Sequence, residues 1–235
     1  MPDSTTVWRT FRPTEGFSTA YLPDRPCRPI RLFVPTDHQP KYAYPLVVLL
    51  HAAGSDEDAA VRLAPLLSRR NYIIACPRGP VCLGGGRTGR VGYGWADRPD
   101  DFVTAVAAWV AAGHHIHPGR HYLVGIGEGA SAALRTVAAA PGRFAGVAGL
   151  GDVPAELLTD LPGGTRVFLG HGADLSRSRV ARLRAAVRLA TARGLPVRLE
   201  AYPAPRPVAT YLRELNRWII RAIGPDTATI PGLLD

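Results

Sequence analysis

The sequence predicts an α/β fold in which a mostly parallel sheet of seven to eight strands carries helices on both faces. Short apolar segments alternate along the chain with segments of helical periodicity, and this alternation is typical of a parallel sheet. Residues 45–50 are apolar throughout, as expected for a strand that is buried on both faces. A chain of 235 residues is long enough to bury a large core in one such domain.

The first expected elements are two short strands over residues 17–22 and 29–34, which a proline-rich turn joins into an antiparallel hairpin. They belong to an N-terminal segment over residues 1–40. After the strand at 45–50, we expect a helix over 56–69 that Asp56 caps, and then a strand over 72–76. The glycine-rich residues 77–95 are predicted to form one long loop, and a loop of this length in a compact domain is usually functional or mobile.

The second half of the chain continues the alternation of strands and helices. We expect strands over residues 121–124, 144–150, 166–169 and 197–202, and helices over residues 100–112, 128–140, 176–193 and 208–223. Residues 224–235 form an irregular tail in this interpretation. The sequence shows no linker and no internal repeat, so residues 1–235 are predicted to form a single domain.

The composition indicates a globular protein of the cytoplasm. Apolar residues make up 46% of the chain, the N-terminus lacks the apolar segment of a signal peptide, and no apolar run is long enough to span a membrane. The three cysteines, Cys27, Cys76 and Cys82, are too scattered for a disulfide framework or a zinc site. We expect Cys76, at the end of an apolar strand, to be an inert buried thiol.

The basic residues are almost all arginines, and the formal net charge is +9. They are spread along the chain and are densest over residues 176–193, where Val180, Leu183 and Val187 recur at helical spacing. This pattern favours a solvated basic face over a narrow apolar stripe. We therefore do not expect a nucleic-acid partner.

Five segments follow strands or turns of the expected sheet in a recognisable order. They are PLVVLLHAAGSDED at 45–58, YIIACPRGP at 72–80, GYGWAD at 92–97, HYLVGIGEGASAAL at 121–134 and VFLGHGADLSRSR at 167–179. Together they resemble the α/β-hydrolases of the small carboxylesterase and phospholipase-like group, over about residues 45 to 220. The resemblance implies an α/β-hydrolase fold with its site at the carboxyl ends of the strands.

The residues that would carry the chemistry of that family are missing. The family places a serine at the centre of a Gly-x-Ser-x-Gly turn, and Gly127 stands there between Gly125 and Gly129. The resemblance implies a catalytic histidine in the loop after the last strand, but that loop has Arg206 and Pro207 instead. Neither side chain is a general base at neutral pH.

The remaining family positions are partly kept. Asp174 corresponds to the acidic member of the triad, and Trp95 and His171 are expected to line the crevice. The loop that would form the oxyanion hole begins at His51, where Ala52 and Ala53 replace the usual glycine.

The other oxyanion donor would be the N–H of Glu128, whose carboxylate adds negative charge. These features predict a pseudo-esterase with a degenerate triad. It would keep a crevice for a small molecule or a protein partner and would use no cofactor or metal. The sequence is compatible with a homo-oligomer.

One alternative is an active hydrolase whose nucleophile has moved to Ser55, Cys82 or Ser131, with His51 or His171 as the base. The ordinary roles of these residues are different: Ser131 fits a buried position in its helix, Ser55 a helix cap, and the two histidines structural positions.

A second alternative is nucleotide binding through Gly125, Gly127 and Ala130, which fit a loose dinucleotide pattern with Asp152 after the next strand. Glu128 would repel a phosphate at that helix end. A third alternative is a metal site formed by the closely spaced histidines, for which we favour turn and cap roles. These histidines are His114, His115, His117 and His121.

Overall fold

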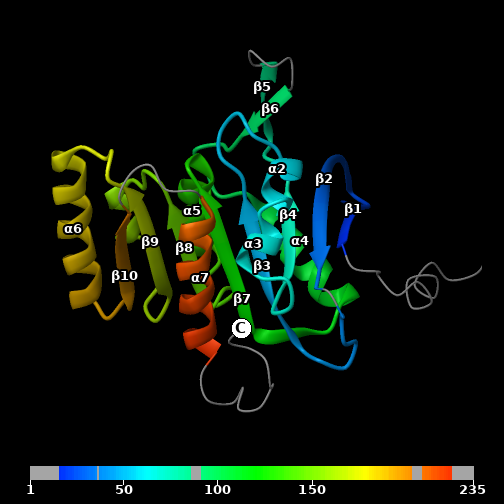
Figure 1. The fold of residues 1–235 in the computed structure, drawn as a ribbon. Coiled ribbons are helices and arrows are strands. Elements are labelled where there is room, and N and C mark those ends of the chain that lie inside the picture. The colour runs from blue at the N-terminus through cyan, green and yellow to red at the C-terminus, as the bar shows by residue number, and fades with distance from the viewer. Residues whose placement is uncertain (1–15, 36, 86–90, 203–207, 224–235) are drawn as a thin grey trace, which may run out of the picture.

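Eight strands form one twisted sheet in the computed structural model, which describes residues 16–35, 37–85, 91–202 and 208–223. The strand order is β1-β2-β4-β3-β7-β8-β9-β10, and the strands from β4 to β10 are parallel (Figure 1). The antiparallel pair at the edge is β1 (Gly16–Leu22) and β2 (Arg25–Val34). The predicted fold class and the N-terminal hairpin are therefore confirmed.

The remaining strands of the sheet match the apolar segments of the sequence. They are β3 (Tyr44–Leu50), β4 (Ile73–Pro77), β7 (Ile116–Ile126), β8 (Gly146–Leu150), β9 (Arg166–Gly172) and β10 (Val197–Tyr202). All seven residues of β3 are buried, which follows from its central place and its cover on both faces.

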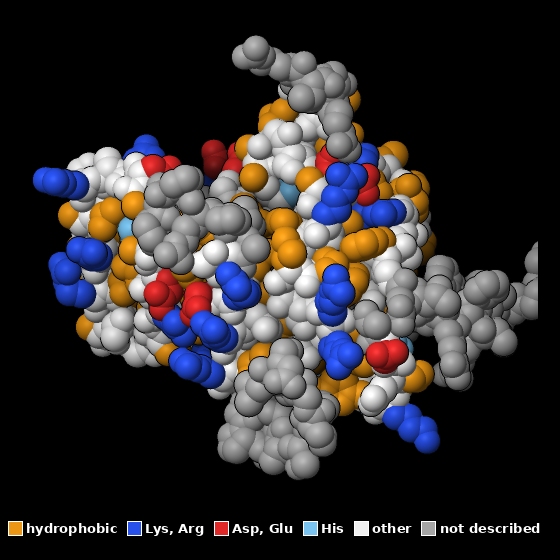
Figure 2. Space-filling view, in the orientation of Figure 1, with side chains coloured by type: hydrophobic (Ala, Val, Ile, Leu, Met, Phe, Trp, Pro, Cys, Tyr) orange, Lys and Arg blue, Asp and Glu red, His pale blue; other side chains and the backbone are white. Residues whose placement is uncertain are grey.

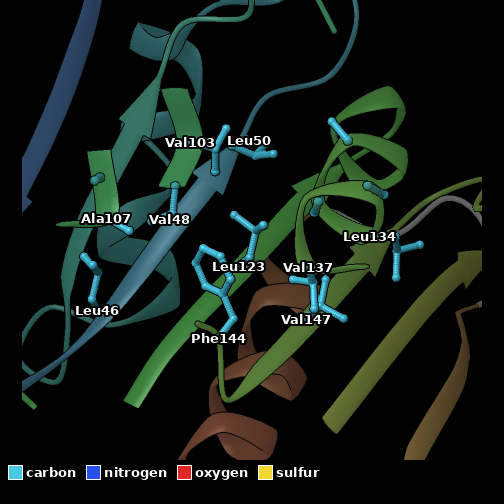
Figure 3. Close-up of a cluster of buried hydrophobic side chains, with 14 of the residues drawn as sticks. Leu46, Val48, Leu50, Val103, Ala107, Leu123, Leu134, Val137, Phe144 and Val147 are labelled. Atoms are coloured by element: carbon cyan, nitrogen blue, oxygen red, sulfur yellow. The ribbon is translucent and has the colours of Figure 1, made fainter. Parts of the chain in front are cut away.

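The two faces of the sheet carry separate apolar cores, because successive side chains of a strand point to opposite sides. Leu46, Val48 and Leu50 of β3 belong to one core, which Figure 3 shows, and Val47 and Leu49 belong to the other. The first core is covered by α4 (Asp101–Gly113), α5 (Glu128–Ala139), the short 3₁₀ helix η1 (Ala155–Leu158) and α6 (Arg177–Ala192). The second is covered by α2 (Glu57–Val61), α3 (Ala64–Leu67) and α7 (Val208–Ile223).

The helix expected over residues 56–69 is two short helices instead. Asp56 caps the first of them, since its carboxylate accepts a hydrogen bond of 2.6 Å from the Ala59 N–H. Pro65 lies in the first turn of α3, and proline lacks the N–H that would continue the preceding helix. The single helix was thus wrong, while the cap is confirmed.

The long loop predicted over residues 77–95 was also wrong in part, because it contains a hairpin. The strands β5 (Val81–Gly85) and β6 (Val91–Gly94) pair with each other and project beyond the carboxyl edge of the large sheet (Figure 1). Strand β7 begins earlier than expected, at Ile116, because Ile116 pairs with Tyr44 of β3. The expected tail over 224–235 lies outside the described residues.

The helix α6 has the predicted division between a narrow buried stripe and a basic outer surface. Leu183 and Ala190 are buried, while Arg182, Arg184 and Arg188 are exposed. Figure 2 shows arginine side chains in several separate parts of the visible face, including the edge where α6 lies. No helix of the described residues is long and apolar enough to cross a membrane.

Two ion pairs connect the N-terminal hairpin to the start of α4. The Arg28 guanidinium donates to both carboxylate oxygens of Asp100, at 3.1 and 2.7 Å, and Arg25 pairs in the same way with Asp101. Asp100 also caps α4 by accepting from the Phe102 N–H. Because both partners of the Arg28–Asp100 pair are largely buried, this pair is screened less by solvent than an exposed one.

We predict that Asp100→Ala lowers the free energy of unfolding by about 2–3 kcal/mol, since it removes a cap and leaves Arg28 without its carboxylate. Asp100→Asn keeps an oxygen for the cap and should lose less. Urea denaturation measures both. Asp97→Ala is the control, because Asp97 forms an ion pair with Arg135 while its side chain is almost fully exposed. Equal losses in Asp97→Ala and Asp100→Ala would contradict the prediction.

Candidate functional site

The candidate site lies where β7 turns into α5, at the carboxyl edge of the sheet. Gly127 is the residue of the turn, with φ 55° and ψ −123°, and its N–H donates to the Leu150 carbonyl of the next strand. This backbone conformation is rarely adopted by residues with a side chain. The predicted tight turn with positive φ at Gly127 is confirmed.

The glycines on either side of Gly127 are required by close backbone packing. A Cβ on Gly125 would collide with the Gly129 carbonyl oxygen, and one on Gly129 would lie 2.5 Å from the His51 oxygen and 2.7 Å from the Leu50 oxygen. Real Cβ atoms do not come this close to backbone oxygens. The end of β3 and the first turn of α5 therefore touch through a glycine that has no substitute.

Position 127 itself has more room. The nearest atom to a Cβ placed on Gly127 is the Ala52 Cβ at 3.3 Å. A side chain at 127 would therefore point toward Ala52, in the segment that resembles the oxyanion loop. The turn thus has room for a small side chain, and glycine leaves that room empty.

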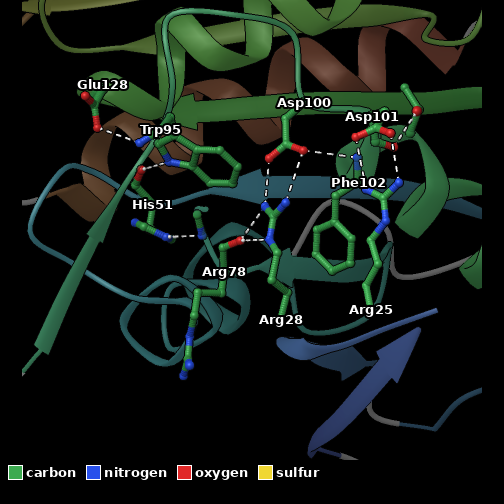
Figure 4. A network of polar contacts seen from close by, with 11 residues as sticks. Arg25, Arg28, His51, Arg78, Trp95, Asp100, Asp101, Phe102 and Glu128 are labelled. Atoms are coloured by element: carbon green, nitrogen blue, oxygen red, sulfur yellow. Dashed lines mark hydrogen bonds and ion pairs between the residues drawn. The ribbon is translucent and has the colours of Figure 1, made fainter. Parts of the chain in front are cut away.

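His51 is buried and both of its ring nitrogens are engaged. Its Nδ1 is 2.9 Å from the Ala52 oxygen, and its Nε2 accepts a 2.9 Å hydrogen bond from the Gly79 N–H. The imidazole is therefore neutral with its proton on Nδ1. Figure 4 shows the ring beside Trp95, whose indole N–H donates to the His51 carbonyl oxygen. His51 holds two loops together and has no nitrogen left to accept a proton from a nucleophile.

All seven histidines of the chain lie among the described residues, so each can be placed. They are His38, His51, His114, His115, His117, His121 and His171. None follows residue 171, and the loop after β10 therefore has no imidazole. His171, at the end of β9, is buried; its Nδ1 is 2.9 Å from the Gly172 oxygen, while its Nε2 has no hydrogen-bond partner among the described residues.

Asp174 lies in the loop after β9, beside the end of β10. The preceding residue, Ala173, donates its N–H to the Tyr202 oxygen. The Asp174 carboxylate folds back over Gly172, next to Tyr211 of α7, and the residue is exposed. This is where the resemblance expects the acidic triad member. Arg206 and Pro207, the residues at the expected place of the histidine, lie outside the described residues.

Glu128 directs its carboxylate across the site toward the hairpin. Its Oε2 accepts a 2.9 Å hydrogen bond from the Trp95 backbone N–H (Figure 4). The same oxygen lies 2.9 Å from the point that a Cβ on Gly94 would occupy. Glu128 is exposed, so a full negative charge stands at the first residue of α5.

Solved structures with similar backbones are esterases. A ferulic acid esterase has a TM-score of 0.65 at 14% identity over 89% of this chain and 98% of its own. A carboxylesterase from Mesorhizobium loti has a TM-score of 0.58 at 22% identity over 86% of this chain and 98% of its own. A thermostable esterase has a TM-score of 0.62 at 21% identity; the match covers 90% of this chain but 60% of that one.

This chain has the α/β-hydrolase fold. The identities are too low to show more than the fold, and neither a protein-family model nor a curated protein sequence matches the chain. Within the α/β-hydrolase fold, the turn at Gly127 is the place of the nucleophile elbow. The sequence had therefore placed the strand-to-helix turn correctly, although the engaged state of His51 and the direction of Glu128 were not foreseen.

The other candidate nucleophiles of this α/β-hydrolase fold are Ser55, Cys82 and Ser131. Ser131 is buried in α5, and Ser55 pairs through its backbone with Tyr93 of the hairpin. The expected cap role of Ser55 was wrong, since Asp56 caps the helix. Cys82 is exposed on β5, and Cys76 is buried, as predicted. Within the described ranges, no hydrogen bond joins Ser55, Cys82 or Ser131 to a histidine.

The residues of the nucleotide-binding and metal-binding alternatives make other contacts in the structure. The Asp152 carboxylate forms an ion pair with Arg179 of α6. His114 is the C-cap of α4, close to His38, which stacks on Tyr44. His121 lies within β7, six residues before Gly127. In the part of the chain that the structure describes, no three metal-binding side chains gather.

Two surface pockets lie outside the candidate site, since Gly127 lines neither of them. One, of about 360 Å³, lies against α5 and η1. The other, of about 500 Å³, lies between β2 and the start of α4 and is lined by the Arg28–Asp100 network.

We predict that Gly129→Ala destabilises the fold by more than about 3 kcal/mol, because its Cβ would press on two backbone carbonyls that cannot move independently. Gly127→Ala should cost only about 1–2 kcal/mol, which is the cost of a positive φ. Gly142→Ala is the matched control, with φ 76° and no atom within 4 Å of the added carbon. Thermal or urea unfolding gives the order. A Gly129→Ala protein as stable as Gly142→Ala would contradict the packing described for the turn.

Acidification should weaken the fold through His51. Burial lowers the pKa of this imidazole below its ordinary value, so the unfolded chain binds the proton more readily than the folded one. The contribution of neutral His51 is complete above pH 6.5 and is lost as the pH falls below it. From pH 7 to pH 5, unfolding free energy should fall more steeply for the native protein than for His51→Gln, by up to about 1.4 kcal/mol per pH unit. His115 lies at an exposed site, and His115→Gln should leave the slope of unfolding free energy against pH as it is in the native protein. If His51→Gln had that same slope, the pH dependence could not be assigned to His51.

Proposed function

We propose that the protein is a catalytically impaired esterase homologue that uses the carboxyl edge of its α/β-hydrolase fold to bind a ligand or a partner. One observation carries the proposal. The turn around Gly127 keeps its tight glycine packing and its approach to Ala52, while the position that would hold the nucleophile has no side chain. A scaffold maintained this closely, without its reacting atom, favours a binding role for the site.

The placement of the histidines supports the same proposal. A serine nucleophile needs a base within hydrogen-bond reach, and the histidine nearest to the turn, His51, already accepts from the Gly79 N–H. In the serine protease subtilisin, loss of the triad serine or histidine lowers kcat by about a millionfold. The residual rate from backbone donors alone is on the order of 10³–10⁴ over water.

The negative charge of Glu128 also opposes ester hydrolysis. An oxyanion hole works by presenting donors to a developing negative charge. A carboxylate at the first residue of α5 repels such a charge, although solvent weakens this repulsion because Glu128 is exposed.

The direct test is the hydrolysis of p-nitrophenyl butyrate by the purified protein. We expect a rate that differs little from that of the buffer, and the same result for Ser55→Ala, Cys82→Ala and Ser131→Ala. Turnover well above the buffer rate that one of these three substitutions abolishes would overturn the proposal and identify a relocated nucleophile.

Gly127→Ser separates the loss of the nucleophile from the loss of the histidine. The room at position 127 admits a serine, but both ring nitrogens of His51 are already engaged by the backbone. We therefore predict that Gly127→Ser alone does not restore turnover of p-nitrophenyl butyrate. Recovery of a rate above about 10⁴-fold over water would mean that a general base is present and that the proposed impairment rests on the nucleophile alone.

A further inference from the structure

Near Gly127, the carboxylate of Glu128 lies next to apolar side chains of the projecting hairpin. The Trp95 N–H donates a hydrogen bond to this carboxylate. Val81 pairs across the hairpin with Gly94 and therefore lies on the same face of it. Leu83, two residues further along β5, shares that face. The Leu83 Cδ1 lies 3.2 Å from the point where a Cβ on Gly94 would be, and Glu128 Oε2 lies 2.9 Å from the same point. The carboxylate and the apolar side chain are neighbours.

The apolar residues of this face are not covered by the rest of the described chain. Leu83 is 53% exposed and Val81 38% exposed, although both stand next to the strand-to-helix turn. The hairpin is nevertheless held in place. The Tyr93 N–H donates to the Ser55 oxygen, and the Tyr93 oxygen accepts from the Gly54 N–H. A Cβ on Gly92 would lie 2.5 Å from the Gly54 oxygen. The exposed apolar face is thus fixed relative to Glu128.

The charge of Glu128 decides which ligands suit this place. A helix N-terminus behaves as about half a positive charge and would attract an anion. The Glu128 carboxylate is a full negative charge at the same helix end, so the local potential is negative. The net charge of +9 acts from further away and is screened over about 8 Å at physiological ionic strength.

The carboxylate also has bonding capacity left. A carboxylate offers about four acceptor positions, and the hydrogen bond from Trp95 to Oε2 is the one described for Glu128. Glu128 is exposed, so the remaining acceptor positions are accessible beside Gly94 and Leu83. An ammonium group bound there would form charge-assisted hydrogen bonds, which are about twice as strong as neutral ones.

We propose that this site binds an organic cation: an ammonium group held by Glu128, with an apolar body that packs on Leu83 and Val81. This inference rests on the proposed binding function of the same edge and names its ligand class. It accounts for the acidic residue at a position where an esterase would suffer from it. It also accounts for the apolar side chains left exposed on the hairpin.

A purely structural role for Glu128 is the competing explanation, since acidic residues stabilise the first turn of a helix. Glu128→Gln distinguishes the two roles. The glutamine oxygen can still accept from the Trp95 N–H, so the hairpin contact is kept while the charge is lost. Glu156→Gln, on the exposed part of η1, is the matched control for the change in net charge.

The experiment compares three probes that share one ring: benzylammonium, benzyl alcohol and benzoate. Titration followed by NMR, with the Trp95 amide and indole signals as reporters, locates the binding. We expect benzylammonium to bind at least tenfold more tightly than benzyl alcohol and benzoate not to bind at the Trp95 signals. Glu128→Gln should remove the preference, Leu83→Ser should weaken benzylammonium, and Glu156→Gln should leave it unchanged.

Two results would overturn the inference: equal binding of the cation and the alcohol by the native protein, or an unchanged preference in Glu128→Gln. Preferential binding of benzoate would show that the helix end outweighs Glu128 and would overturn it as well. Ester turnover measured on the same samples keeps the two proposals apart. If the protein hydrolyses the ester and also selects the cation, only the impaired-enzyme proposal is contradicted. If it neither hydrolyses the ester nor selects the cation, only the cation-site proposal is contradicted.

Discussion

The contact between Gly129 and the carbonyl oxygens of Leu50 and His51 is the constraint on which the rest of the site depends. It brings the end of β3 against the first turn of α5, and thereby fixes the loop from His51 to Ser55 relative to Gly127. The His51 carbonyl oxygen also accepts from the Trp95 indole, so the same peptide anchors the hairpin. Any residue larger than glycine at 129 would separate these segments, which is why the turn requires glycine there.

That constraint is independent of the chemistry that the turn usually serves. The packing uses backbone atoms, whereas hydrolysis needs a side chain at 127 and an imidazole within reach. Glycine at position 127 is therefore compatible with the fold, and it avoids the strain that a side chain would bring at a positive φ. In the proposed function, Gly127 leaves the packing of the turn intact while it lacks a reacting side chain, and Glu128 adds a negative charge at the same helix end.

The sequence predicted the sheet because its strands are continuous apolar runs, and it located the turn because glycines at 125 and 129 have a steric cause. It could not predict that β5 and β6 pair, since Val81, Leu83 and Val91 point to solvent and leave no core periodicity. Pro65 splits a helix that the apolar pattern suggested was continuous. The role of His51 depends on Gly79, which is 28 residues away, and the direction of Glu128 depends on Trp95; such long-range partners leave no local pattern.

Reaction with a fluorophosphonate, followed by intact-mass spectrometry, tests most directly whether the turn has lost its nucleophile. These reagents form a covalent bond with a serine that a neighbouring base activates, whatever ester the enzyme prefers. The account predicts an unmodified mass after prolonged exposure to excess reagent. A stoichiometric adduct on Ser55, Ser131 or any other serine of the folded protein would show that an activated nucleophile survives, and would contradict it.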